Sequence, residues 1–227
     1  MISFVIPACN EEKSIGKVIG EIKKAMEKVK EKYEILVVSN STDQTDEIAR
    51  KLGARVIREE KKGYGRAYKT GFRKAKGRII VTGDADCSYP FSEVPKLLKI
   101  LEKENLDFIT TNRFAKMEKG AMPFLHKIGN LILTFFTFIL FGVRVKDSQS
   151  GMWVFRKEFL RKIKSERLSD GMAFSQEIKI LAFTKGKAKE VPISYRKREG
   201  RKKLRSFRDG IGNLISLFKF SEYYGGN

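Results

Sequence analysis

Short apolar runs alternate with amphipathic stretches along the N-terminal part of the chain. The apolar runs are rich in Ile and Val and are bounded by Gly, Pro or polar residues, as is typical of buried strands in a parallel sheet. They predict strands over 2–7, 34–40, 54–59 and 78–84. Apolar residues at helical spacing and capping residues between these runs predict helices over 10–33, 41–53 and 65–77. This alternation predicts an α/β fold with a mostly parallel central sheet and helices on both faces.

Acidic and small polar residues follow three of the predicted strands. These strand ends carry the motifs PACNEE (7–12), SNSTDQT (39–45) and GDADCSYP (83–90). Ligands of open α/β sheets bind beyond the carboxyl ends of the strands. The three motifs are therefore expected to meet along one rim of the sheet and to form the functional site.

Asp84 and Asp86 are the candidate metal ligands. Side chains at positions i and i+2 of an extended segment point the same way, so both carboxylates can converge on one point. Carboxylate oxygens suit Mg²⁺ or Mn²⁺, which complete their coordination shells with substrate phosphates. In the alternative interpretation both are ordinary turn residues after a strand, which is common for Asp near Gly.

The composition adds an expectation about partners and compartment. The 227 residues, 41% of them hydrophobic, carry 47 Lys and Arg against 27 Asp and Glu, a formal net charge of +20. Such a surplus predicts an anionic partner, which could be a nucleic acid, a phosphorylated substrate or an acidic membrane surface. The two cysteines, Cys9 and Cys87, favour a reducing cytosol. The N-terminal run lacks the features of a signal peptide, so export by that route is not expected.

Six motifs occur in an order and at a spacing that resemble family 2 glycosyltransferases of the GT-A fold. They look most like the branch that makes polyprenyl-phosphate sugars, typified by dolichyl-phosphate mannose synthase. The resemblance covers residues 2–210, nearly the whole chain. The motifs are PACNEE, NSTDQT, KGYGRAYKTGF, DADCSYP, DSQSGMWVFRKE and VPISYRKREGRKKL.

The resemblance implies a nucleotide-diphosphate sugar donor, a divalent metal (Mg²⁺ or Mn²⁺) and a lipid phosphate acceptor. In that reaction the acceptor oxygen displaces the nucleotide with inversion at the anomeric carbon. A phosphate monoester has a second pKa of about 6, so its oxygen is already anionic at neutral pH and needs no strong general base. The site should then be rich in cations and poor in histidine, and the chain has one histidine.

The resemblance also implies roles for individual residues. The nucleotide-binding positions are Pro7, Glu11, Ser39, Asp43, Arg66 and Asp84. The metal positions are Asp84, Asp86 and Ser88, and the catalytic positions are Asp86, Arg113 and Asp147. The acceptor phosphate is expected at Arg113, Lys127, Arg198 and Lys203. Asp147, which opens DSQSG, has an alternative interpretation as an ordinary loop residue.

A dense basic cluster extends from 196 to 208. It holds eight basic residues against one acidic residue, Glu199. A solvated basic loop is the alternative, but a cluster so unbalanced favours contact with phosphate or with a membrane.

Two apolar segments predict contact with a membrane surface. The run over 130–143 is too short for the roughly 20 apolar residues that span a bilayer. A core helix is the usual explanation, but the phenylalanine density, the basic residues before the run and the resemblance favour a helix near 124–142 that lies on the membrane. The expected organisation is a catalytic domain over 1–208 and an amphipathic segment over 209–227, with Leu214, Leu217 and Phe218 on one side. The protein is expected to be peripheral, on the cytoplasmic face.

The sequence thus predicts a metal-dependent, inverting hexosyltransferase acting on dolichyl or polyprenyl phosphate. GDP-mannose is the favoured donor and UDP-glucose the alternative. A family 2 enzyme with a non-lipid acceptor is a further alternative. A nucleic-acid binder is a distant one, because no helix-turn-helix, zinc-finger or RNP motif is evident. No nucleic-acid partner is expected.

Overall fold

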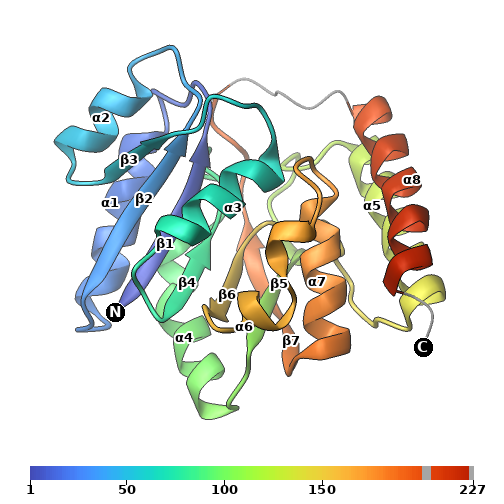
Figure 1. Cartoon of the computed structure of the whole chain (residues 1–227). Coiled ribbons are helices and arrows are strands. Elements are labelled where there is room, and N and C mark those ends of the chain that lie inside the picture. Colours follow the sequence, from blue (N-terminus) through green and yellow to red (C-terminus); the bar gives the residue numbers. More distant parts are fainter. Residues whose placement is uncertain (201–205, 225–227) are drawn as a thin grey trace.

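A seven-stranded sheet forms the centre of the computed structural model, which describes residues 1–200 and 206–224 (Figure 1). The strands are β1 (Ile2–Ala8), β2 (Tyr33–Ser39), β3 (Arg55–Arg58), β4 (Ile79–Thr82), β5 (Phe108–Met117), β6 (Trp153–Arg156) and β7 (Ala188–Tyr195). Their order is β3-β2-β1-β4-β6-β5-β7. Strand β6 is antiparallel to both of its neighbours, and the other pairs are parallel. The predicted mostly parallel sheet is confirmed.

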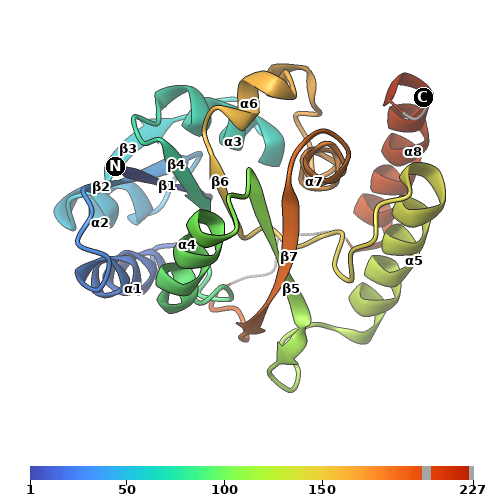
Figure 2. The same ribbon diagram turned by 90° about the horizontal axis from the view of Figure 1, so that it is seen from below.

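Helices cover both faces of this sheet, as predicted (Figure 2). They are α1 (Ile15–Glu27), α2 (Thr45–Lys51), α3 (Tyr64–Lys74), α4 (Val94–Lys103), α5 (Phe124–Phe141), α6 (Phe159–Lys162), α7 (Phe174–Lys185) and α8 (Ser206–Tyr224). Helix α1 begins later than the pattern predicted, because residues 10–14 form a turn in which Asn10 has a φ of 54°. Helix α2 likewise begins only at Thr45, after the STDQ turn.

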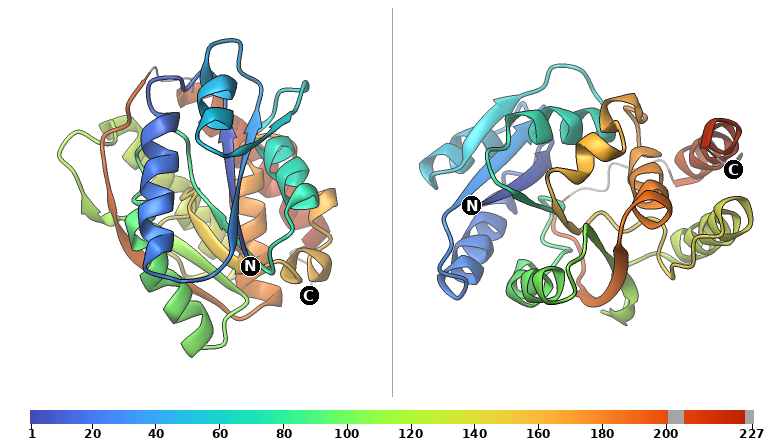
Figure 3. Two further views of the ribbon diagram at one scale, coloured as in Figure 1. Left: turned by 90° about the vertical axis from the view of Figure 1, so that its left-hand side faces the viewer. Right: turned by 60° about the horizontal axis from the view of Figure 1, so that its bottom comes forward.

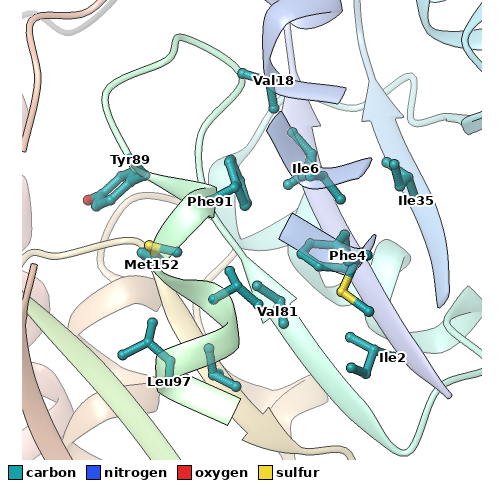
Figure 4. Close-up of a cluster of buried hydrophobic side chains, with 14 of the residues drawn as sticks. Ile2, Phe4, Ile6, Val18, Ile35, Val81, Tyr89, Phe91, Leu97 and Met152 are labelled. Carbon is teal, nitrogen blue, oxygen red and sulfur yellow. The ribbon is translucent and has the colours of Figure 1, made fainter. Parts of the chain in front are cut away.

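Two hydrophobic cores lie on opposite faces of the sheet. The alternating side chains of β1 are divided between them: Phe4 and Ile6 enter one core and Val5 the other. The first core is filled from α1, α2 and α4, and Figure 4 shows part of it around Phe4, Phe91 and Leu97. The second is filled from α3, α6 and α7 and is rich in aromatic rings. This double-sided packing fixes the strand ends that carry the candidate site.

Helices α5 and α8 lie side by side beyond the β7 edge of the sheet (Figures 1 and 3). They contact each other through the rings of Phe136 and Phe218, whose centroids are 5.5 Å apart, and of Phe141 and Phe220, 5.8 Å apart. The predicted grouping of Leu214, Leu217 and Phe218 on one side agrees with their spacing along α8, but their burial differs: Leu217 is buried, whereas Phe218 is 43% exposed although its ring contacts Phe136. Leu217 and Phe220 of α8 enter the second core.

Candidate active site

The polar motifs meet where β1, β2 and β4 end, at the upper edge of the sheet in Figure 1. Pro7 lies near the end of β1, half-buried and paired with Val38 of β2. Glu11 is 7% exposed, and its backbone N–H donates to the Thr45 hydroxyl at 2.8 Å. The predicted convergence of PACNEE and SNSTDQT is therefore present, and it places the Glu11 carboxylate at the rim.

Asp43 holds the turn between these two motifs. Its carboxylate accepts hydrogen bonds from the backbone N–H and hydroxyl of Thr45 and from the backbone N–H of Glu12. Burial raises the pKa of Asp43, but these hydrogen bonds outweigh burial and lower it below its ordinary value. Asp43 is partly exposed, so a bound nucleoside can still reach it.

Ser39 is fully buried at the end of β2. Its hydroxyl donates to the carboxylate of Asp46 in α2 and accepts from the backbone N–H of Ser41 at 3.0 Å. In this geometry the side chain joins β2 to α2 and presents no open surface to a nucleobase. Its nucleotide-binding role stays a prediction that would require this turn to move.

Asp84 and Asp86 follow β4 in a turn instead of continuing the strand. The expected i, i+2 extended geometry is therefore wrong, although both carboxylates still lie at the same rim and interact electrostatically. Asp86 accepts hydrogen bonds from the backbone N–H (3.0 Å) and the hydroxyl of Ser88. Ser88 is buried and faces Asp86 directly, so its hydroxyl orients that carboxylate.

The environment of Asp84 and Asp86 fits a divalent cation. Burial, followed by the neighbouring charge of Asp86, raises the pKa of Asp84 to about 7. Among the side chains that the structure describes, no third His, Cys, Asp or Glu joins them in a metal cluster. Two carboxylates alone suit Mg²⁺ or Mn²⁺ that takes its remaining ligands from phosphate and water.

Arg198 reaches this pair from the segment after β7. Its Nη2 lies 3.5 Å from both Asp86 Oδ2 and Glu11 Oε1. Its Nε is buried and has no hydrogen-bond partner among the residues that the structure describes. A buried guanidinium N–H without a partner is costly, so this donor fits an anionic ligand at the rim.

Arg113 and Asp147 form a buried, two-point ion pair. Arg113 Nε lies 2.7 Å from Asp147 Oδ2, and Arg113 Nη2 lies 2.8 Å from Oδ1. The backbone N–H of Arg113 and the side-chain amide of Asn130 donate to the same carboxylate. Burial alone would raise the pKa of Asp147, but Arg113 outweighs it and lowers the pKa to about 2. Asp147 is fully buried and is therefore not accessible to a substrate. Its carboxylate contacts Arg113 instead.

The remaining predicted cations lie in different settings. Arg66 pairs with Asp170, at 3.1 Å, in the loop before α7. A Cβ on Gly65 would lie 2.2 Å from the Ser169 carbonyl oxygen, so the glycines of KGYGR allow this loop to approach closely. Lys127, near the start of α5, is half-buried and has no ion-pair partner in the described part of the chain. Lys203 lies outside the described residues.

The pattern along the sequence missed a group of tyrosines around Asp84. The pKa values of Tyr64, Tyr68 and Tyr89 are raised well above the ordinary value by burial and by neighbours that include Asp84. Tyr89 accepts a 2.7 Å hydrogen bond from the backbone N–H of Gly151. A Cβ on Gly151 would lie only 2.4 Å from the Tyr64 hydroxyl oxygen, so the DSQSG loop packs tightly against these tyrosines.

Lys179 of α7 is a second residue that the sequence did not single out. Its side chain is 2% exposed, and its Nζ donates to the Ser150 carbonyl at 2.8 Å. Burial lowers the pKa of Lys179 to about 7. Lys179 thus holds the DSQSG loop against α7. No motif in the sequence marks this lysine.

An apolar surface on α5 and α8 adjoins the site. Of the exposed large hydrophobic side chains that the structure describes, all but Met1 and Tyr33 belong to these two helices. Helix α5 starts before the predicted apolar run, and with 18 residues it is long and apolar enough to cross a membrane by length and composition. Helix α5 is therefore longer than the apolar run over 130–143, which was expected to be too short to span a bilayer. Only 17% of it is buried, so it is not a core helix.

Comparisons with known proteins agree with this fold. The family model described as Glycosyl transferase family 2 matches residues 3–164. The low-salt glycan biosynthesis hexosyltransferase of Haloferax volcanii is 40% identical over 212 residues, covering 92% of this chain and 51% of that protein. The dolichyl-phosphate hexose transferase of the same organism is 34% identical over 219 residues, covering 96% and 92%. The chain thus spans about half of the first relative and most of the second.

The fold itself is shared with solved glycosyltransferases. Glucosyl-3-phosphoglycerate synthase from Mycobacterium tuberculosis superposes with a TM-score of 0.78 at 22% identity, over 98% of this chain and 80% of that one. At this identity the likeness concerns the fold alone, and it confirms the predicted GT-A architecture. Together with the family match, these relatives show that the chain belongs to glycosyltransferase family 2.

Proposed function

We propose that this protein transfers a hexose from a nucleotide-diphosphate sugar to a polyprenyl phosphate at a membrane surface, with inversion and with help from a divalent metal. One observation carries the proposal: Arg113 acts electrostatically on Asp84 of the carboxylate pair, and its partner Asp147 is bound by Asn130 of α5, a helix with an exposed apolar surface. Relatives named as a dolichyl-phosphate hexose transferase and a dodecaprenyl-phosphate galacturonate synthase support this acceptor class.

On the donor side, Asp84 and Asp86 would hold Mg²⁺ or Mn²⁺ against the diphosphate. When bound, such an ion neutralises the charge that develops on the leaving diphosphate. The solved M. tuberculosis synthase contains Mn²⁺ with UDP, which supports a divalent metal as cofactor of this fold. Ser88 would keep Asp86 in its binding orientation, and Glu11 and Asp43 would shape the nucleoside side of the cleft.

On the acceptor side, Arg113 and Arg198 would bind the phosphate of the lipid. Arginine suits this role because its planar guanidinium can make paired hydrogen bonds to phosphate oxygens. Lys127 and Lys203 remain candidate contributors to the same binding. The acceptor oxygen is already anionic, so no protein base is needed, and Asp147, with its lowered pKa and complete set of donors, would act by holding Arg113.

The lipid portion would lie along α5 and α8. Several α5 side chains, among them Leu131, Phe135 and Ile139, are more than half exposed. An apolar surface of this kind marks an interaction site, and the high positive charge of the chain suits an anionic lipid surface. Peripheral attachment at the cytoplasmic face is part of this proposal.

For the donor we propose GDP-mannose, with UDP-glucose as the alternative. The relatives do not favour GDP: one is named as using UDP-N-acetylglucosamine, and the solved M. tuberculosis synthase holds UDP-glucose. Because Ser39 is buried, this residue does not indicate which nucleobase the protein binds. The nucleotide must therefore be identified by experiment.

The deciding experiment combines titration with a transfer assay. Isothermal titration of GDP and UDP, each with Mn²⁺ and with EDTA, should reveal metal-dependent binding of one nucleotide. That nucleotide's hexose should then appear on a short-chain polyprenyl phosphate, with anomeric inversion detected by NMR. Transfer to a non-lipid acceptor, without binding to anionic vesicles, would contradict the acceptor proposal. Salt-sensitive DNA binding without nucleotide binding would contradict the whole assignment.

A further inference from the structure

Helix α5 has its polar and apolar faces reversed relative to an ordinary surface helix. Its buried residues are Asn130 (4% exposed), Leu133 (5%) and Thr137 (1%), whereas most of its Phe, Leu and Ile side chains are exposed. Asn130, Thr134 and Thr137 stand at spacings i, i+4 and i+7, so they share one face of the helix. This polar face is turned towards the protein and must find hydrogen-bond partners there.

The partners of this face belong to the DSQSG loop and to α7. The amide nitrogen of Asn130 donates to Asp147 Oδ1 at 2.7 Å, and its amide oxygen accepts from the Thr134 hydroxyl at 3.1 Å. The Thr134 hydroxyl also accepts from the backbone N–H of Ser148 at 3.1 Å. Further along the helix, Thr137 accepts from the side-chain amide of Gln176 at 2.6 Å. Only Asn130 reaches the ion pair at the site.

Asn130 therefore acts on a carboxylate that already fixes Arg113. Arg113 uses Nε and Nη2 on Asp147, while its Nη1 has no hydrogen-bond partner among the described residues. The guanidinium also lies over the ring of Tyr195, at 5.3 Å from the centroid. Because Nε and Nη2 of Arg113 both donate to Asp147, the direction in which Nη1 points is set by the plane of the Asp147 carboxylate.

We propose that Asn130 is a positioning residue, which orients the free edge of Arg113 towards an anionic oxygen by fixing Asp147. This inference deepens the proposed function and rests on it for the identity of that anion, the acceptor phosphate. The apolar side of the same helix turn faces outwards, where Leu131 is 57% exposed. Contact of α5 with a lipid surface and the orientation of Arg113 are thereby linked through a single helix.

The first test compares Asn130→Ala with Thr137→Val. Each substitution removes two hydrogen bonds from the same face of α5, but only Asn130→Ala removes a contact with Asp147. With a short-chain polyprenyl phosphate, Asn130→Ala should raise the acceptor KM about tenfold, the effect of losing a bond to a buried charged group. The donor KM should stay unchanged, and Thr137→Val should retain the wild-type acceptor KM. Equal losses in the two variants, or parallel changes in both KM values, would overturn the proposal.

A second measurement follows Arg113 without any substrate. The Nε–H of Arg113, which donates to Asp147, should give a slowly exchanging ¹⁵N-resolved NMR signal. Asn130→Ala should shift this signal and make its proton exchange faster. Thr137→Val should leave the signal unchanged. In an Asp147→Asn background, Asn130→Ala should have no further effect on the acceptor KM. An unchanged Arg113 signal in Asn130→Ala would overturn the positioning role. Absence of transfer by wild-type protein would contradict the proposed function but leave this NMR result interpretable.

Discussion

Two carboxylate sites at the same sheet rim have opposite electrostatics. The pKa of Asp84 is raised to about 7 by burial beside another carboxylate, whereas the pKa of Asp147 is lowered to about 2 by Arg113. Asp147 is paired at two points with a buried cation, whereas among the described residues the Asp84–Asp86 pair has only the longer contact of Asp86 with Arg198, at 3.5 Å, and needs further positive charge from a ligand. The comparison teaches that the first site can be complete before substrate arrives, and that the second is completed by the ligand it binds.

The largest effect should come from Asp86→Asn, which removes a charge from the site that is expected to bind the metal. Metal-assisted neutralisation contributes several kcal/mol, so transfer should fall by roughly a thousandfold or more. Steady-state turnover at saturating Mn²⁺ measures this. The matched control is Glu102→Gln, an exposed acid on α4, which should keep wild-type turnover. Turnover of Asp86→Asn within tenfold of wild type would contradict the metal assignment.

Asp147→Asn should act mainly on stability, because it leaves the Arg113 charge buried without its partner. Breaking a buried ion pair on one side costs about 3–5 kcal/mol. Chemical denaturation monitored by fluorescence of Trp153 would measure the change in the free energy of unfolding. Asp86→Asn, lacking a fully buried partner, should lose far less, and equal losses would remove the contrast between the two sites.

The two sites should also differ in their response to pH. Asp84 must lose its proton to bind metal, so metal-dependent nucleotide affinity should fall about tenfold per unit as the pH drops below 7. The stability of the metal-free protein should change with pH in the opposite direction. The folded state keeps a proton on Asp84 that the unfolded state has lost, so the free energy of unfolding should decrease as the pH rises from about 4 to about 7.

Titration calorimetry and denaturation at several pH values test both statements, with Asp84→Asn as the control that should lack them. Asp147 contributes no such step in this range, because its pKa lies near 2. A pH-independent nucleotide affinity between 6 and 8 would contradict the raised pKa of Asp84.

The smallest effect is expected from Ser88→Ala. The hydroxyl of Ser88 donates a hydrogen bond to Asp86. This contact is much weaker than the two-point ion pair that Arg113 forms with Asp147. Loss of one hydrogen bond to a charged group should weaken metal-dependent nucleotide binding by roughly tenfold or less. Titration with Mn²⁺ present measures it, and a loss as large as that of Asp86→Asn would instead make Ser88 a direct ligand.

The strand and helix pattern allowed most of the fold to be predicted, because β1 and α1 carry local signals of period and capping. The antiparallel strand β6 could not be predicted, since its pairing with β4 and β5 depends on contacts between segments far apart in sequence. The GT-A architecture came from the order of six motifs and not from any single element.

The site was predictable where motifs follow strands and not where long-range partners decide. Asp84 and Asp86 could be proposed from their position after β4, but the pairing of Arg66 with Asp170 and the burial of Ser39 could not. The role of Asn130 left one signal, a polar stripe at i, i+4 and i+7 within an apolar run. That stripe indicates which side of α5 faces the protein.

The reversed helix α5 has a practical consequence for handling the protein. Its outward Phe, Leu and Ile side chains, with those of α8, form a surface that water does not solvate well, so the purified chain should self-associate in buffer without detergent. Oligomers formed in this way would cover the surface along which the proposed lipid acceptor lies and lower the measured turnover as protein concentration rises. Enzyme assays therefore belong in mild detergent or nanodiscs, with light scattering recorded alongside each rate.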